Sequence, residues 1–248
     1  MTDPRPGTGW SLRDRLCVAL DLEVRDEILR VADEVQDVAG YVKLNSAFTL
    51  HGPGLVRDLR AMGAQVFLDL KLHDIPNTMA AYGRALTALG AGIVTIHPAG
   101  GLDMMRAMAT AARESAWASG ADAPKLIGIA LLTSVDQRVL NEEVGVPGDV
   151  ADEVLRKSLL AAEAGLDGVV CAPAEIGHIR GKLPDGFMYV TPGTRSPGDS
   201  GRDHRRTATH AEAVAAGASL LVVGRRILNT PDRRKAATEV LEEMAGAA

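Results

Sequence analysis

The chain of 248 residues alternates short apolar runs with longer segments in which apolar residues recur every three or four positions. The short runs are rich in Val, Ile and Leu and are bounded by Gly, Pro or polar residues, which is typical of buried β-strands. They span residues 16–20, 41–45, 65–70, 93–97, 126–132, 168–172, 188–192 and 220–224. The pattern therefore predicts eight strands separated by helical segments.

The clearest helical segments are 24–38, 101–118 and 148–165. In the third, apolar residues follow three- and four-residue steps up to Gly165, a residue type that commonly ends helices. Strands that alternate with helices without a linker-like interruption predict a single α/β domain, a (β/α)8 or TIM barrel over residues 1–248, and such barrels have about 250 residues. We expect residues 1–10 and 245–248 to be frayed.

A doubly wound α/β sheet is the main structural alternative. Such a sheet usually has a G-x-G-x-x-G turn after its first strand, where this chain has VALDLEVRD. The segment GHIRGKL (177–183) lacks the glycine spacing and the final Ser or Thr of a phosphate-binding P-loop. Because neither nucleotide motif is present, the barrel is the preferred prediction.

The segment VFLDLKLHDIPNT places four ionisable side chains at the end of an apolar run. Side chains alternate between the two faces of a strand, so Asp69 and Lys71 share one face while the leucines between them face the surrounding helices. In a barrel, functional side chains lie at the carboxyl ends of the strands. There Lys43, Asp21 and Asp74 would extend the charged set.

Two interpretations of this charged set are open. Polar residues at strand ends can simply satisfy one another in salt bridges, because short motifs such as D-x-K-x-x-D match freely. Alternatively, a lysine held between carboxylates stays protonated and becomes a positioned proton donor. That arrangement suits a reaction in which negative charge develops on a substrate carbon and is then quenched by a proton. The second interpretation is favoured because the charged pair lies inside an apolar strand.

A second cluster follows the seventh predicted strand, in the segment TPGTRSPGDSGRDHRR (191–206). One interpretation is a solvated surface loop. Barrels often bind phosphate, however, in the loops after strands seven and eight. Arg195 and Arg225 would then form a phosphate grip, with Gly224 allowing close backbone approach and the Gly-rich loop closing as a lid.

A metal site built from Asp69, Asp74 and His97 is conceivable. The ammonium group of Lys71 in their midst opposes a bound cation, so we expect no metal. His97 is equally compatible with a hydrogen-bonded packing role.

Composition and charge exclude several classes. Hydrophobic residues make up 46% and charged residues 24%, which is ordinary for a globular protein, and the net charge of −5 argues against a nucleic-acid binder. The first residues lack the apolar core of a secretory signal, and no apolar run approaches the roughly 18 residues of a membrane span. Cys17 and Cys171 lie in apolar runs, which indicates buried thiols in a reducing cytoplasm.

Taken together, these motifs resemble the orotidine 5′-phosphate decarboxylase family in its bacterial form. The resemblance covers nearly the whole chain in order. It comprises VALD (18–21), VKLN (42–45), FLDLKLHDIPNT (67–78), IHPAGG (96–101), LLTSVD (131–136), VTPGTR (190–195) and VVGRR (222–226). The family fold is the TIM barrel predicted above. The implied activity is cofactor-independent conversion of orotidine 5′-monophosphate to UMP and CO2 in cytoplasmic pyrimidine biosynthesis.

The resemblance implies a charged catalytic array of Lys43, Asp69, Lys71 and Asp74. Lys71 would protonate C6 of the pyrimidine as CO2 leaves, and Asp69 would lie against the substrate carboxylate. The family is homodimeric, and Asp74 would come from the other subunit of the dimer. The implied substrate-binding residues are Asp21, Thr78 (also from the partner), Ser134, Pro192, Arg195, His204, Gly224 and Arg225.

Two positions depart from the family pattern. His204 occupies the place of a Gln that bridges pyrimidine and phosphate, and its ring cannot reproduce the two-ended amide. Pro98 replaces a more common Ala and should fix the chain after His97 without touching the chemistry.

Two other functions have to be distinguished from this one. Related enzymes that act on keto sugar phosphates, the hexulose-phosphate synthases and keto-gulonate-phosphate decarboxylases, share D-x-K-x-x-D but use Mg²⁺. The continuation I-P-N-T and the segment LLTS favour the pyrimidine enzyme. A non-catalytic sensor of phosphorylated ligands is the second alternative, and it gives no reason for the combination of Lys43, Asp69 and Lys71.

Overall fold

The computed structural model describes residues 10–196 and 208–246, and in them the predicted barrel is confirmed. Each strand pairs in parallel with the next, and β8 pairs with β1 to close the barrel. The strands are β1 Leu16–Ala19, β2 Tyr41–Leu44, β3 Gln65–Leu72, β4 Ile93–Ile96, β5 Lys125–Ile129, β6 Gly168–Val170, β7 Met188–Pro192 and β8 Leu220–Val223. All eight predicted strands are found, with ends that differ by a few residues at most.

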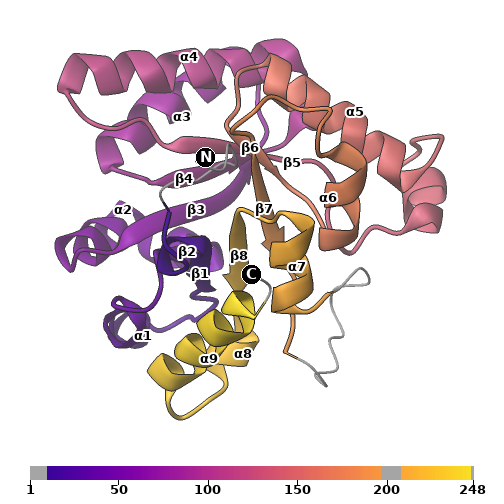
Figure 1. The fold of residues 1–248 in the computed structure, drawn as a ribbon. Coiled ribbons are helices and arrows are strands. Elements are labelled where there is room, and N and C mark those ends of the chain that lie inside the picture. Colours follow the sequence, from indigo (N-terminus) through magenta and orange to yellow (C-terminus); the bar gives the residue numbers. More distant parts are fainter. Residues whose placement is uncertain (1–9, 197–207, 247–248) are drawn as a thin grey trace.

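Helices surround the strands (Figure 1). They are α1 Arg25–Val35, α2 Ser46–Ala61, α3 Pro76–Leu89, α4 Leu102–Ser119, α5 Val150–Glu163, α6 Pro173–Ile179, α7 His210–Ala216, α8 Arg225–Leu228 and α9 Arg233–Ala245. The three helical segments predicted above correspond to α1, α4 and α5. Gly165 follows α5 with φ of +80°, the left-handed conformation that ends helices at little cost for glycine.

The core has two apolar layers. The outer layer lies between strands and helices, and Leu68 and Leu72 of β3 belong to it as expected. The inner layer fills the barrel and comprises Cys17, Ala19, Phe67, Ile93, Ile127, Met188, Val190, Leu220 and Val222. Because inward positions recur every second residue, the next inward position after Phe67 is Asp69, and the next after Ile93 is Thr95. The alternation that packs the interior therefore brings polar groups to the barrel mouth.

The expected fraying of 1–10 and 245–248 falls mostly outside the described residues. Of those described, Trp10 packs against the inner layer and contacts Tyr41, with ring centroids 5.9 Å apart, and Ala245 is the last residue of α9. Both cysteines lie in buried positions. Over the described ranges, no helix is long and apolar enough to cross a membrane.

Candidate active site

A cavity of about 1120 Å³ opens at the carboxyl ends of the strands. Its wall includes residues from β1, β2, β3, β5, β6, β7 and β8, so the closed barrel brings distant parts of the chain to one site. Nine residues predicted from the sequence line it. These are Asp21, Lys43, Asp69, Lys71, Ser134, Pro192, Arg195, Gly224 and Arg225.

Asp69 is the centre of a charged array in this cavity. Its Oδ2 atom lies 2.8 Å from Nζ of Lys71 and 3.3 Å from Nζ of Lys43. Lys43 also lies 3.5 Å from Oδ1 of Asp21. The side chains of Lys43 and Asp69 are only 9% and 13% exposed, whereas Lys71 is 31% exposed. Lys71 is therefore the ammonium group of the pair that is most accessible to a ligand.

Thr95 holds the array from the neighbouring strand. Its hydroxyl donates a hydrogen bond to Oδ1 of Asp69 at 2.9 Å, and it accepts one from the backbone N–H of Lys71 at 2.9 Å. Thr95 is fully buried, so neither bond competes with water. The expectation from sequence assigned it no part in the site. An inward-facing Thr in the apolar run IVTI is the signal that could have identified it.

The backbone at Lys71 is not that of a regular strand. Lys71 has φ of +50°, and the pairing of β3 with β4 shifts register between Leu68 and Leu72. For a residue other than glycine, a positive φ of this kind lowers the stability of the fold by on the order of 1–3 kcal/mol. Asp69 and Lys71 meet in the cavity as predicted. The direction of the Lys71 side chain depends on this irregular backbone as well as on the alternation of side chains along the strand.

The pKa of Asp69 results from opposing effects. Burial raises it, but the charges of Lys43 and Lys71 and the hydrogen bonds from Lys71 and Thr95 outweigh burial, so the pKa lies below its usual value. The carboxylate therefore stays ionised at neutral pH. A lowered pKa means that Asp69 stabilises the fold above the pKa of an unfolded aspartate, about 3.9, and loses this effect as pH falls through the folded value.

Replacing Thr95 by Val tests this coupling. We expect the variant to lose about 1.5–3 kcal/mol of unfolding free energy at pH 7, because a buried carboxylate loses a hydrogen bond. Below pH 4 the loss should shrink as Asp69 becomes protonated. Thr87→Val is the matched control, since the Thr87 hydroxyl is also buried but donates to the uncharged carbonyls of Gly83 and Ala112. Urea unfolding at several pH values measures both, and an equal pH dependence in the two variants would contradict the assignment.

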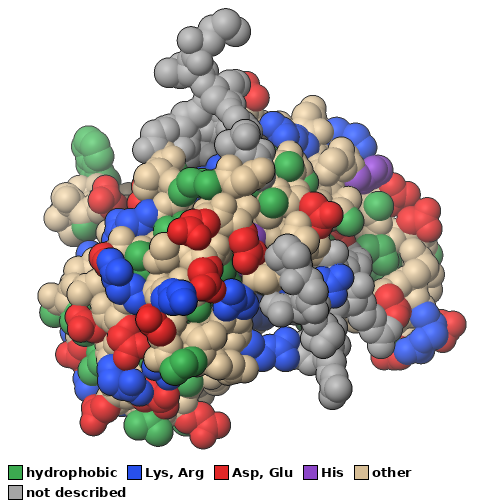
Figure 2. Space-filling view, turned by 60° about the horizontal axis from the view of Figure 1, so that its bottom comes forward, with side chains coloured by type: hydrophobic (Ala, Val, Ile, Leu, Met, Phe, Trp, Pro, Cys, Tyr) green, Lys and Arg blue, Asp and Glu red, His purple; other side chains and the backbone are tan. Residues whose placement is uncertain are grey.

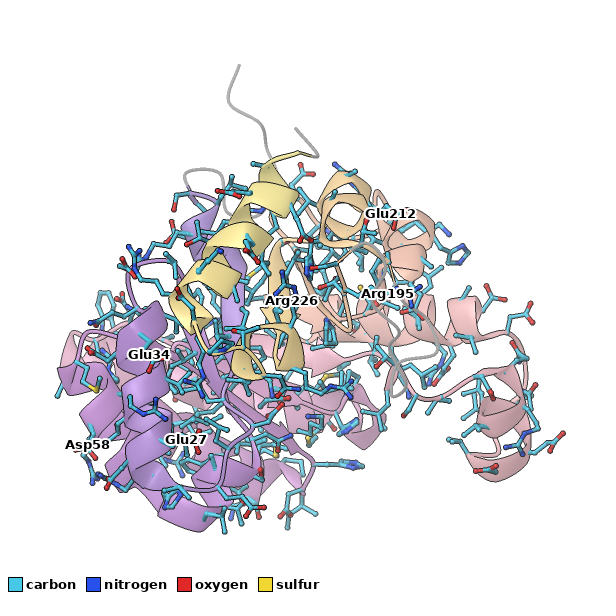
Figure 3. The ribbon with its side chains drawn as sticks, turned by 90° about the horizontal axis from the view of Figure 1, so that it is seen from below. Glu27, Glu34, Asp58, Arg195, Glu212 and Arg226 are labelled. Carbon is cyan, nitrogen blue, oxygen red and sulfur yellow. The ribbon has the colours of Figure 1, made fainter. Side chains whose placement is uncertain are left out.

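The arginines of the predicted phosphate grip line the same cavity. Arg195 follows β7, and its backbone N–H donates to the carbonyl of Ala208 at 3.1 Å. Arg225 opens α8 directly after Gly224, whose φ and ψ of −116° and −96° turn the chain between β8 and the helix. Figure 3, seen from below, shows Arg195 on the loop after β7 and Arg226 on the neighbouring α8. Guanidinium groups from both of these segments in one cavity suit a phosphate, which accepts paired hydrogen bonds.

Asp74 and Thr78 do not line the cavity of their own chain. Asp74 is exposed, and its Oδ1 accepts a hydrogen bond from the backbone of Ile75 at 2.7 Å. Thr78 lies in the first turn of α3. Between them the apolar side chain of Ile75 is 66% exposed. The cavity thus brings together three of the four residues of the predicted array, while Asp74 and the substrate-binding residue Thr78, both assigned to a partner subunit, lie outside it.

His97 and His73 lie beside the array without lining the cavity. Their ring centroids are 6.1 Å apart, and His97 is half-buried. Burial, followed by the nearby His73, Lys157 and Lys71, lowers the pKa of His97. Within residues 10–196 and 208–246, no three His, Cys, Asp or Glu side chains are arranged to hold a metal ion. Pro98 is buried at the start of a short 3₁₀ helix, Pro98–Gly100, and His204 lies outside the described residues.

Several cavity residues were not identified from the sequence. Ser196, Arg226 and Glu243 line the cavity beside Arg195. Ser196 was read only as part of a loop, and Glu243 belongs to the last helix, far along the chain from the other site residues. Figure 2 brings the lower side of Figure 1 forward and shows that acidic and basic side chains are interspersed on this lower side. No pattern in the sequence indicates that Ser196, Arg226 and Glu243 belong together, because they meet only when the barrel closes.

Comparison with known proteins identifies the family. Residues 14–240 match the model of the "Orotidine 5′-phosphate decarboxylase / HUMPS family". The chain is 44% identical over 233 residues to a protein of Moorella thermoacetica named orotidine 5′-phosphate decarboxylase, covering 94% of this chain and 92% of that protein. A protein of the same name from Heliobacterium modesticaldum is 42% identical over 236 residues, covering 94% and 96% of the two chains.

Solved structures agree with these relatives. The crystal structure of orotidine 5′-phosphate decarboxylase from Lactobacillus acidophilus matches with a TM-score of 0.79 and 33% identity, covering 92% of this chain and 98% of that one. The fold, the cavity and the sequence relatives lead to one conclusion: the chain belongs to the orotidine 5′-phosphate decarboxylase / HUMPS family.

Proposed function

We propose that this protein decarboxylates orotidine 5′-monophosphate to UMP and CO2 in pyrimidine biosynthesis, without a metal or organic cofactor. One observation carries the proposal. Asp69 lies between the ammonium groups of Lys43 and Lys71 in a cavity that also contains Arg195 and Arg225. The array matches a reaction that develops charge on carbon, and the arginines match a phosphorylated substrate. The names of the relatives support the same substrate.

In the proposed reaction the bond between C6 of the pyrimidine and its carboxylate carbon breaks. The bonding electron pair stays on C6, and the carboxylate leaves as neutral CO2. Lys71 then transfers a proton from Nζ to C6, which gives UMP, and the lysine recovers a proton from water. Lys71 suits this role because it is the more accessible of the two ammonium groups that flank Asp69. A positioned donor of this kind contributes about 10²–10⁴-fold to a rate.

Asp69 is proposed to face the substrate carboxylate. Its lowered pKa keeps it ionised, so it repels the bound carboxylate but not the neutral product CO2. Lys43 and Thr95 keep Asp69 from turning away, because each holds one of its oxygens. The binding energy that overcomes this repulsion comes from remote contacts, with Arg195 and Arg225 on the phosphate.

The remaining contacts follow from position. The exposed Asp21 and the buried Lys43 pair at the cavity wall and would bind the ribose hydroxyls. Ser134, in the segment after β5, would contact the pyrimidine, and Pro192 and Gly224 would shape the wall near the phosphate. His204 remains a candidate contact in the place of the usual Gln.

We further propose a homodimer in which Asp74 and Thr78 complete the partner's cavity. Both residues stay out of their own cavity, and the exposed Ile75 between them provides an apolar surface for a partner. An isologous twofold contact would place each pair in the opposite site.

The absorbance of orotidine 5′-monophosphate should fall when purified protein is added without metal. The rate should stay within about twofold after exhaustive EDTA treatment, because the proposed chemistry uses Lys71 where an enediolate route uses Mg²⁺. A known Mg²⁺-dependent enzyme, treated in parallel, confirms that chelation is complete. Loss of this activity with EDTA and its return with Mg²⁺ would contradict the metal-free reaction. Turnover of a keto sugar phosphate that requires Mg²⁺, without turnover of orotidine 5′-monophosphate, would favour the related keto sugar phosphate enzymes.

A further inference from the structure

We propose that His210 and Glu243 are positioning residues that hold the segment Gly193–Ser196, and with it Arg195, in place for the substrate phosphate. This inference rests on the proposed function. We call the four side chains Thr194, His210, Glu243 and Ser196 the clasp. None of these residues was assigned a role from the sequence, and the reaction proposed above does not use them.

The clasp holds the chain on both sides of Arg195. On one side, Nδ1 of His210 lies 2.9 Å from the hydroxyl of Thr194. On the other, the hydroxyl of Ser196 donates to Oε1 of Glu243 at 2.9 Å. Nε2 of His210 lies 3.8 Å from Oε2 of Glu243, within ion-pair distance when the imidazole is protonated. The two residues that flank Arg195 are therefore tied to one His–Glu pair.

His210 is held in a fixed position. It is fully buried and is the first residue of α7. The start of this helix is set by reciprocal hydrogen bonds between Thr209 and Glu212, at 2.8 and 3.1 Å. Thr209 in turn forms an isolated parallel bridge with Arg195. In Figure 3, Glu212 lies on α7 beside the loop that carries Arg195.

Glu243 is held just as firmly through its helix. At the start of α9, Arg233 lies 3.2 Å from Glu34 and 3.6 Å from Glu27 of α1. Both glutamates are labelled on α1 in Figure 3, where α9 lies next to that helix. Farther along α9, Glu239 pairs with Arg226 at 2.7 Å. The ion pairs of Arg233 and Glu239 therefore fix the helix that carries Glu243, and with it the position of Glu243 beside Ser196.

Arg226 closes the arrangement from α8. Its Nε donates to the hydroxyl of Ser196 at 2.9 Å while its other end pairs with Glu239. Ser196 therefore accepts from Arg226 and donates to Glu243, so its single donor and one of its two lone pairs are both used. Because Ser196, Arg226 and Glu243 also line the cavity, the clasp is continuous with the wall of the proposed phosphate site.

The physical consequence is preorganisation. A guanidinium on a loop loses conformational freedom when it binds a phosphate, and a loop already held in place loses less. Loss of the clasp should leave Asp69 in place, because Lys43, Lys71 and Thr95 hold its carboxylate. The predicted defect is therefore specific for ligands that carry a phosphate.

His210→Ala and His210→Asn test the proposal. The Asn side chain can replace Nδ1 towards Thr194, whereas Ala cannot. For His210→Ala we expect the Kd for UMP and the KM for orotidine 5′-monophosphate to rise about 10–100-fold, with uridine binding changed by less than about twofold. His210→Asn should recover most of the loss. Equilibrium binding of UMP and uridine, measured by NMR or calorimetry, does not depend on turnover.

His178→Ala is the matched control. His178 lies on the neighbouring α6 and has a carboxylate of Asp152 at 3.7 Å, but it is outside the cavity, so UMP binding should not change. Should His210→Ala fail to fold, Thr194→Val removes the same hydrogen bond from the loop side and carries the same expectation. Equal weakening of UMP and uridine, or no change in either, overturns the clasp. A wild-type protein that binds UMP but does not consume the substrate overturns the proposed function alone.

Discussion

We expect replacement of Lys71 by Ala to lower turnover of orotidine 5′-monophosphate by about 10⁴-fold or more, whereas UMP binding should change by less than about tenfold. The variant loses the proposed proton donor and also one of the two cations beside Asp69. The vinylic carbanion at C6 then has no positioned proton, so the loss falls on kcat. UMP already carries its C6 proton and keeps its contacts with the phosphate side of the cavity. Absorbance assays and equilibrium binding measure the two effects.

Lys125→Ala is the control for Lys71→Ala. Lys125 also pairs with an aspartate, Asp167 at 3.5 Å, but it lies at the start of β5 and outside the cavity. It should retain full turnover. If Lys71→Ala binds UMP and still turns over substrate within tenfold of the wild type, Lys71 is not the donor. If the wild type binds UMP without any turnover, the protein is a sensor of phosphorylated ligands.

Mixing Asp69→Ala with Asp74→Asn should restore activity that neither variant has alone. Each homodimer should be impaired by about 10³-fold or more, because every site lacks one carboxylate of the array. In a heterodimer one site collects both substitutions, while the other has Asp69 from one subunit and Asp74 from its partner, both intact. Random exchange at equal concentrations should give about one quarter of the wild-type activity.

The control for this experiment is a mixture of Asp69→Ala with Lys71→Ala. These residues meet in the same cavity of one chain, 2.8 Å apart, so every site of their heterodimer remains damaged and no activity should return. Subunit exchange is verified independently with differently tagged chains. Proven exchange without recovery in the first mixture would show that Asp74 serves its own subunit.

Much of the fold and of the site could be predicted because both depend on local patterns. Runs of Val, Ile and Leu separated by helical periods determine a barrel, and a period of two along each strand determines which side chains enter it. Asp69 follows that rule directly, one inward position beyond Phe67 of the inner layer, and Lys43 lies one inward position beyond Tyr41, which packs against that layer. The turn at Gly224, directly before Arg225, likewise depends on adjacent residues of the chain.

Features that depend on contacts between distant segments could not be predicted in this way. Thr95 was not recognised, because its two hydrogen bonds cross from β4 to β3. The left-handed backbone of Lys71 accompanies a shift in register between those strands. A lysine at this position does not indicate such a shift. Nothing near Arg195 in the chain indicates that Glu243 would hold the loop beside it.

Residue types and their periods determined the barrel and the charged groups at its mouth, because strand alternation is a property of each strand alone. Closure of the barrel decided the rest. It sets the distances of 2.8 and 3.3 Å around Asp69, buries Thr95 against that carboxylate, and brings α7 and α9 onto the two sides of Arg195. Side chains far apart in sequence acquire fixed distances only when packing removes the freedom of the chain between them.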